Sequence, residues 1–184
     1  MKFPPRTARA AASFCALLTV VSLTTACGPS SDFKATLTKA KAGDSQAQLE
    51  VGLLYLRGTA VSQSDTEGVN WVKQAAQSGL AAAQRTYGLM LRDGAGANRN
   101  PAQGREWLEK AAHQNDAAAQ AELAGMLGVF SPPFEPIEAM KWALLAEKNG
   151  ATNGAALQKI IAVQMTASQL AEARRKAAEF VIDK

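Results

Sequence analysis

Apolar positions recur at three- and four-residue intervals from residue 33 onward, and short polar stretches separate the resulting segments. Residues 45–57 illustrate the pattern, because Ala47, Val51 and Tyr55 fall on one face of a helix and Gly58 follows as a stop signal. A shorter amphipathic stretch over residues 31–42 ends at Gly43 in the same way. The spacing therefore predicts a chain of helices joined by short turns.

The predicted helices follow one another in a repeating order. Seven positions recur after 36 residues: Gly43, Gly52, Gly58, Trp71, Ala75, Ala76 and Gly79 are matched by Gly79, Gly88, Gly94, Trp107, Ala111, Ala112 and Asn115. A third copy is one residue shorter, with Ala124 and Trp142 at equivalent positions and a proline-rich loop over 128–136. Such a period is typical of repeat arrays. We therefore predict an all-α fold, an α/α solenoid built as a superhelix of antiparallel helix hairpins, with about three and a half repeats.

Capping patterns predict where these helices begin. Ser64 and Asn100 each precede a Glu or Gln by three residues, which is the spacing of a capping box, and Pro101 suits the first position of a helix. By the same spacing we expect Ser45 to cap the first hairpin and Thr166 to cap a closing helix that continues to about residue 182.

Glycine stands in the middle of two predicted helices, at Gly52 and Gly88. A glycine there costs roughly 1 kcal/mol relative to alanine, so its recurrence predicts that a neighbouring helix approaches closely at that point. In the second helix of each hairpin, a small residue precedes the tryptophan by three positions. This pattern predicts that Trp71, Trp107 and Trp142 occupy equivalent buried places between stacked hairpins.

Residues 1–26 have the features of a signal peptide. Lys2, Arg6 and Arg9 precede an apolar stretch over 10–23 that is too short to span a bilayer. The segment from Leu23 to Cys27 resembles the lipobox of bacterial lipoproteins, in which the cysteine is acylated and becomes the first residue. The resemblance implies a lipid such as palmitate on Cys27. We expect a short linker over 27–32 and the repeat domain over 33–182. With glycine next to the cysteine, the resemblance also implies sorting to the outer membrane of a Gram-negative cell, facing the periplasm. The alternative is an ordinary signal peptide cut near Ala26, which leaves a free thiol.

Charge and cysteine content narrow the function classes further. The full chain has 20 basic and 16 acidic residues, but three basic residues leave with the signal peptide, so the remainder is nearly neutral. Nucleic-acid binding requires a dense basic patch, and we expect no nucleic-acid partner. Of the two cysteines, Cys15 lies in the signal peptide, so we expect no disulfide in the mature chain.

The residues from Gly43 to Tyr55, followed by Gly58, Val61, Asp65, Trp71, Ala75, Ala76 and Gly79, resemble the Sel-1-like repeat family, which is related to tetratricopeptide repeats. The second unit continues the resemblance, and residues 165–173 are similar to the closing helix of the family. The resemblance implies a right-handed superhelix used for protein–protein contact, with its inner face lined by the first helix of each hairpin, here called the A helix.

Two groups of residues are candidates for partner contact. On the A helices, we expect positions away from the core to face a partner protein, namely Glu50, Leu53, Arg57, Arg85, Leu89, Met90 and Arg92. In the third loop, Phe130 and Phe134 flank two prolines and form a second candidate. The alternative is that both rings fold down onto the following helix and do not contact a partner. The alternative for the first group is that these residues line a solvated groove with scattered apolar side chains and bind no partner.

Catalytic and metal-binding constellations are not evident in the sequence. His113 is the only histidine, and we expect it on the surface near a helix C-terminus rather than in a metal or catalytic site. Glu106 and Glu109 are flanked by Arg105 and Lys110, which favours a charge-balanced surface. We therefore predict a protein that is not an enzyme and needs no cofactor or metal: a lipid-anchored envelope adaptor, in a narrower version an immunity lipoprotein against a secreted effector. The alternatives are an envelope enzyme acting on cell-wall material and an assembly factor of an export system.

Overall fold

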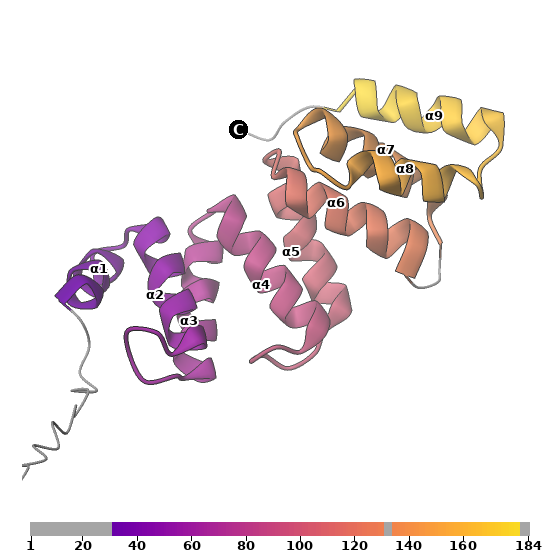
Figure 1. The fold of residues 1–184 in the computed structure, drawn as a ribbon. Coiled ribbons are helices and arrows are strands. Elements are labelled where there is room, and N and C mark those ends of the chain that lie inside the picture. The colour runs from indigo at the N-terminus through magenta and orange to yellow at the C-terminus, as the bar shows by residue number, and fades with distance from the viewer. Residues whose placement is uncertain (1–30, 131–133, 181–184) are drawn as a thin grey trace, which may run out of the picture.

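A computed structural model describes residues 31–130 and 134–180, and all regular structure in these ranges is helical (Figure 1). The elements are α1 (Ser31–Lys41), α2 (Ser45–Arg57), α3 (Asp65–Gln77), α4 (Ala81–Asp93), α5 (Pro101–His113), α6 (Ala117–Gly125), the π-helical turn η1 (Met126–Phe130), α7 (Pro136–Lys148), α8 (Gly154–Ala162) and α9 (Ala167–Ala178). The predicted signal peptide and Cys27 lie outside the described residues. Within those residues, no helix has the length and apolar character needed to cross a bilayer.

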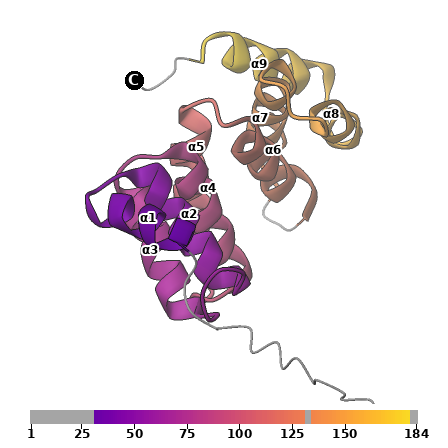
Figure 2. The ribbon, with the colours of Figure 1, turned by 60° about the vertical axis from the view of Figure 1, so that its left-hand side comes forward.

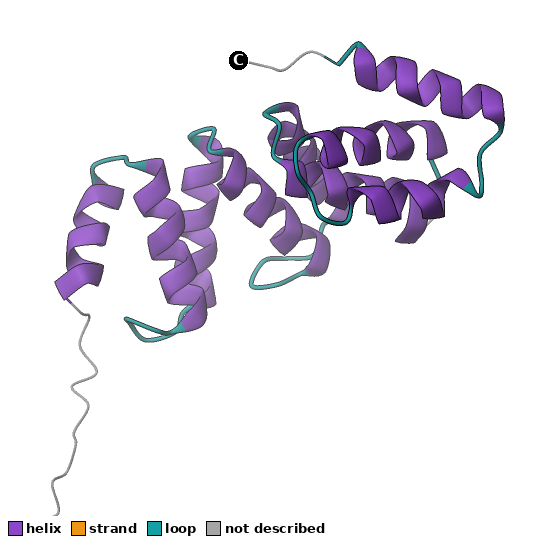
Figure 3. Cartoon of the chain, turned by 45° about the horizontal axis from the view of Figure 1, so that its top comes forward, coloured by secondary structure: helices purple, strands orange, loops and turns teal. Residues whose placement is uncertain are grey.

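The helices form antiparallel hairpins that follow one another along the molecule, which confirms the predicted α/α solenoid (Figures 1 and 3). The hairpins are α2–α3, α4–α5 and α6–α7, with α1 at one end and α8 and α9 at the other. Buried apolar residues divide into three clusters along this axis. Cluster 1 extends from α5 to α9, cluster 2 lies among α2, α3 and α4, and cluster 3 lies between α1 and α2.

Helix ends follow the capping patterns at most positions. The side chains of Ser64 and Asn100 accept hydrogen bonds from the backbone N–H three residues later, and Thr166 forms a complete capping box with Gln169. The prediction for Ser45 is wrong, because Asp44 is the N-cap of α2 and accepts from the N–H of Ala47. Asp44 has an extended backbone conformation from which its carboxylate reaches that N–H directly, so the cap lies one residue earlier.

The mid-helix glycines lie where two helices of one hairpin cross, as expected. A Cβ atom on Gly52 would lie 2.9 Å from the carbonyl oxygen of Gly68, and one on Gly88 would lie 2.9 Å from that of Gly104. The reciprocal position is equally tight, since a Cβ on Gly104 would lie 2.7 Å from the Gly88 carbonyl oxygen. Backbone contact between the two helices therefore requires glycine on both sides of the crossing.

The tryptophans lie beside these crossings rather than within them. Trp142 is buried, whereas Trp71 and Trp107 are half-buried, and the side chains of Val72 and Leu108 are the ones that close over the glycines. The Trp107 ring packs edge-to-face on Tyr87 with a centroid distance of 5.5 Å. The tryptophans are thus equivalent in their position in the hairpin, as predicted, but only Trp142 is fully buried. In the first two units the residue after the tryptophan, Val72 or Leu108, fills the space at the glycine crossing.

Three buried glutamines occupy the same position in successive A helices. Each side chain donates from Nε2 to the carbonyl oxygen eight residues earlier, at the end of the preceding helix: Gln48 to Ala40, Gln84 to Ala76 and Gln120 to Ala112. A buried amide is costly to leave unbonded, and these bonds satisfy its donor while tying each hairpin to the one before it. We call this set the glutamine ladder.

The acceptor side of the glutamine ladder is complete in only two of the three units. Gln84 Oε1 accepts from Gln114 Nε2 at 2.7 Å, and Gln120 Oε1 accepts from Asn149 Nδ2 at 2.9 Å. The equivalent residue of the first unit is Ser78, whose hydroxyl instead donates to the carbonyl of Gln74 in its own helix. The buried Gln48 Oε1 has no hydrogen-bond partner among the described residues.

We predict that Ser78→Gln stabilises the protein. The longer side chain is expected to place its amide against Gln48 Oε1, as Gln114 does against Gln84, and to raise the free energy of unfolding by about 0.5–1.5 kcal/mol. Urea denaturation followed by circular dichroism measures the effect. The gain should vanish when Gln48 is also replaced by methionine, and a gain that persists in that background would contradict the explanation.

Candidate interaction surface

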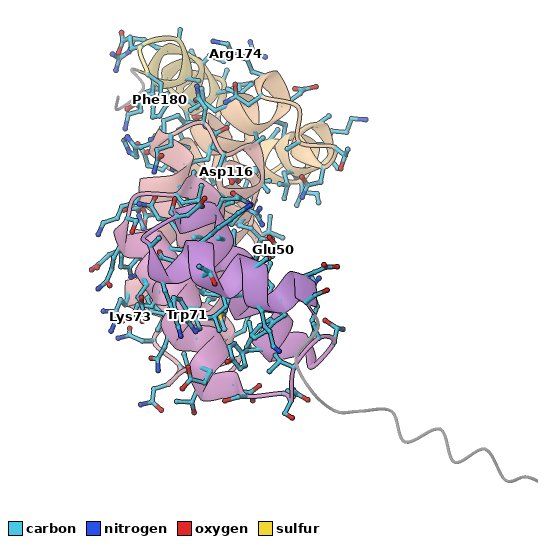
Figure 4. The ribbon with its side chains drawn as sticks, turned by 90° about the vertical axis from the view of Figure 1, so that its left-hand side faces the viewer. Glu50, Trp71, Lys73, Asp116, Arg174 and Phe180 are labelled. Carbon is cyan, nitrogen blue, oxygen red and sulfur yellow. The ribbon has the colours of Figure 1, made fainter. Side chains whose placement is uncertain are left out.

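The accessible sides of α2, α4 and α6, the first helices of the three hairpins, are here called together the A-helix face. Its exposed or half-buried members recur along the repeat: Glu50, Leu53 and Arg57 of α2, Thr86, Leu89 and Asp93 of α4, and Glu122 of α6. Figure 4 shows Glu50 on this side of the molecule and Lys73 of α3 on the opposite side. The surface arises because each A helix buries its other side against its own hairpin and its neighbours.

The predicted contact residues of α2 lie on this surface. Glu50 and Arg57 are exposed, and Leu53 is half-buried, where it packs on cluster 2. Leu89 occupies the equivalent place on α4 and packs on cluster 1. The two leucines thus place a half-buried apolar side chain at the same position of successive A helices, among charged residues. Met90 was predicted for the same surface, and this is wrong: its side chain is 7% exposed and belongs to cluster 2, because it points from α4 into the core beside Leu91.

Arg85 joins the second unit to the third. Its Nε atom donates to both carboxylate oxygens of Asp116, at 3.0 and 3.2 Å. Asp116 is also the N-cap of α6, since its Oδ1 accepts from the backbone N–H of Ala119. One carboxylate therefore begins a helix and holds the preceding unit in place, so Arg85 is engaged within the protein.

Arg92 makes a second link across the same junction. Its Nη1 donates to Glu122 Oε2 at 2.5 Å, and its Nε donates to Asp93 Oδ1 at 2.7 Å. The hydrogen bond from Arg92 lowers the pKa of the Asp93 carboxyl against an opposing effect of burial. The same bond to Asp93, helped by Glu122, raises the pKa of Arg92 above its usual value. On the A-helix face, α4 is thus connected to α6 by charged side chains.

The aromatic residues of the third loop take different positions. Phe134 is 48% exposed, so about half of its surface is accessible, and its role in partner contact stays a prediction. Phe130 ends η1, and its side chain lies outside the described part of the structure. The loop leads directly into α7, whose N-cap Glu135 accepts hydrogen bonds from Arg105 of the preceding unit, at 2.6 and 3.2 Å.

His113 is not the surface residue that its position near a helix end predicted. It is half-buried and packs against Trp142 and Phe180 with ring-centroid distances of 5.5 and 5.2 Å. This aromatic group joins α5, α7 and the segment after α9, which the repeat pattern does not reveal because Phe180 lies beyond the last repeat. Among the described residues, no three His, Cys, Asp or Glu side chains are grouped as metal ligands.

A shallow hollow continues the A-helix face beyond α4. It has a volume of about 330 Å³ and lies between α6 and the turn after α7, with Ala118, Ala121, Glu122 and Thr152 in its walls. Alanines on the outward side of α6 leave this space, because no longer side chain fills it. In the sequence, the alanines at 117–119 and at 121 are the feature that indicates this hollow. Alanine is also common in tightly packed helices, so the feature does not identify a hollow by itself.

Comparison with known proteins matches the sequence to the Sel1 repeat family over residues 45–80, 81–116 and 117–150, which correspond to the three hairpins. A structure of a protective antigen present in uropathogenic Escherichia coli strains, described as displaying an SLR fold, is 28% identical with a TM-score of 0.72. The match covers 80% of this chain and 32% of that protein, so this chain spans about a third of its length. A Sel1 repeat protein from Oxalobacter formigenes is also 28% identical, with a TM-score of 0.64, over 70% of this chain and 97% of that one. No curated protein matches the chain.

The lowered pKa of Asp93 predicts a pH-dependent share of stability. A carboxyl whose pKa is lower in the folded than in the unfolded state stabilises the protein above its ordinary pKa of about 4, and this contribution is lost as the pH falls through the lowered value. Arg92→Gln should therefore reduce the free energy of unfolding at pH 7, and the deficit should shrink at pH 3. Urea denaturation at both pH values measures it.

Arg57→Gln is the matched control, because it makes the same charge change at an exposed position of α2. We expect it to leave the pH dependence unchanged. A deficit of Arg92→Gln that is as large at pH 3 as at pH 7 would contradict the assignment to Asp93.

Proposed function

The chain belongs to the Sel1 repeat family, and from that premise we propose that it is a non-catalytic scaffold, anchored by lipid in the cell envelope, that binds another protein on its A-helix face. Sel1 repeat proteins generally mediate protein–protein interaction. The observation that carries the proposal here is the A-helix face, on which accessible charged residues and half-buried leucines recur at the repeat spacing. This composition suits an interface, in which an apolar centre is surrounded by a polar rim.

We choose the proposed binding residues by the exposure of their side chains in the structure. Glu50, Leu53, Arg57 and Leu89 retain accessible side chains on the A-helix face and are the proposed contacts. Arg85 and Arg92 support the face from its edge by holding α4 against α6, so we assign them a structural role. A partner that covers Leu53 and Leu89 would span two units at the repeat spacing and would be held by both.

The test is site-specific photocrosslinking in living cells. A benzophenone amino acid at position 50, 53 or 89 should capture one and the same protein, because all three positions face it. The same amino acid at position 70 or 74, exposed on α3 of the opposite side, is the matched control and should capture nothing in common with it. Equal capture from both sides, or a different protein from each position of the A-helix face, would contradict a defined partner site.

We further propose that the envelope location depends on an acylated Cys27. The support is the lipobox resemblance together with the start of α1 at Ser31. Only four residue steps separate these positions, and a fully extended chain of that length reaches about 14 Å. A lipid on Cys27 would therefore keep the solenoid at the membrane surface. In a narrower version of the proposal the captured protein is a secreted effector that this protein neutralises there.

Cys27→Ala should move the protein from the membrane fraction to the soluble fraction of the cell envelope. The substitution removes the thiol that accepts the lipid and leaves the solenoid unchanged. Fractionation with immunodetection measures the shift, and metabolic labelling with an alkyne-modified palmitate should mark the wild type only. Ser31→Ala, a few residues further along the chain, is the control and should stay in the membrane fraction. Membrane association that survives Cys27→Ala would show that this cysteine is not the anchor.

A further inference from the structure

The helix α7 has neighbours on two sides at the C-terminal end of the molecule. Both α8 and α9 pack on α7, whereas α8 and α9 make little direct contact with each other (Figure 2). Two adjoining hollows lie along α7, one beside α9 and one between α8 and α9. We call this space the terminal groove.

Apolar side chains form the floor of the terminal groove. It consists of two adjoining hollows of about 250 and 180 Å³ that share Leu144 of α7 and Arg174 of α9. Leu170 and Ala177 of α9 contribute to the two hollows. The lined part of α7 extends from residue 140 to residue 148, which is about 12 Å at 1.5 Å per residue. This length accommodates two turns of a helix.

The rim of the terminal groove carries three cations, Lys148, Lys159 and Arg174, and all three are exposed. None has a hydrogen bond or ion pair within the described residues, although Arg175 and Lys176 of the same α9 are paired with Glu179 and Glu138. The nearby carboxylate of Glu147 accepts a hydrogen bond from Gln158 instead. Because the amide of Gln158 is neutral, Glu147 keeps its negative charge, and the rim has three cations against this one carboxylate. The rim is therefore net positive.

The outer side of α8 extends the apolar surface beyond the groove. Ile160 is 49% exposed and Val163 is 86% exposed, and they are two of the three large apolar side chains that are most exposed in the described structure. In a solenoid the next hairpin would cover such positions, and here α9 lies against α7 instead.

We propose that the terminal groove binds an amphipathic helix of a partner protein, with apolar residues on one side and acidic residues on the other. The apolar floor matches the first side, and the excess of cations on the rim matches the second. The recessed position of the floor favours a helix over a membrane, because a flat lipid surface cannot reach Leu144 between α8 and α9. This site is separate from the A-helix face and holds a partner whether or not that face does.

A designed peptide tests the proposal directly. The probe is a fluorescent 16-residue helical peptide with leucines on one side and glutamates on the other, and its counterpart has lysines in place of the glutamates. With the purified full-length chain, fluorescence anisotropy should show saturable binding of the acidic peptide and none of the basic one. The affinity for the acidic peptide should fall as salt is added. Absence of binding of the acidic peptide overturns the proposal.

Charge reversal locates the binding. Lys148→Glu and Arg174→Glu should each weaken binding of the acidic peptide about tenfold, and the double variant should bind the basic peptide instead. Both residues are exposed, so the variants should retain the helical circular dichroism of the wild type. Lys73→Glu makes the same charge change on exposed α3, outside the terminal groove, and should leave binding unchanged (Figure 4).

Two further measurements distinguish the terminal groove from the A-helix face and from a lipid-binding site. Leu53→Arg on the A-helix face should leave peptide binding unchanged, so failure of the proposed scaffold site and failure of the terminal groove give different results. Vesicles of phosphatidylcholine with one quarter phosphatidylglycerol should not bind through the groove. Vesicle binding that depends on Lys148 and Arg174, or peptide binding that these reversals do not alter, overturns the proposal.

Discussion

Contact between the backbones of two helices is the constraint on which the rest of this structure depends. At Gly52 and Gly68, and again at Gly88 and Gly104, the helices of a hairpin approach until a single Cβ atom would meet a carbonyl oxygen. The approach brings Val72 and Leu108 over the glycines, where both are fully buried. With the hairpin closed in this way, the apolar side of each helix is committed to its partner and its neighbours, and the outer side of each A helix remains for solvent or another protein.

Polar contacts then determine how the hairpins are stacked. The glutamine ladder satisfies a carbonyl at the end of each preceding helix, so the repeat distance is fixed by hydrogen bonds as well as by apolar packing. Between the second and third units, Arg85 and Arg105 reach the carboxylates of the next helix starts. These contacts explain why residues with the composition of a binding surface are partly engaged inside the protein.

Local features of the sequence were sufficient to predict most of the fold. The 36-residue period predicted the hairpins, and Ser64 and Asn100 predicted where two helices begin. Gly52 and Gly88 predicted where the two helices of a hairpin approach closely. The prediction was wrong where the outcome depends on helix rotation or on distant partners. Met90 is next to Leu89 in sequence, but about 100° of rotation separates an accessible side chain from a buried one. Arg85 and His113 meet partners from other units, and a period cannot identify such contacts when the residues are not themselves repeated.

The links between α4 and α6 have a mechanical consequence. Apolar side chains of α5 and α6 in cluster 1 hold the second and third hairpins together, and on the A-helix face Arg85 and Arg92 add charged links across the same junction. Ion pairs that remain partly accessible to solvent are screened by dissolved salt, whereas apolar packing is not. The share of the resistance to bending that Arg85 and Arg92 supply at the junction of the second and third hairpins therefore falls as the ionic strength of the surroundings rises.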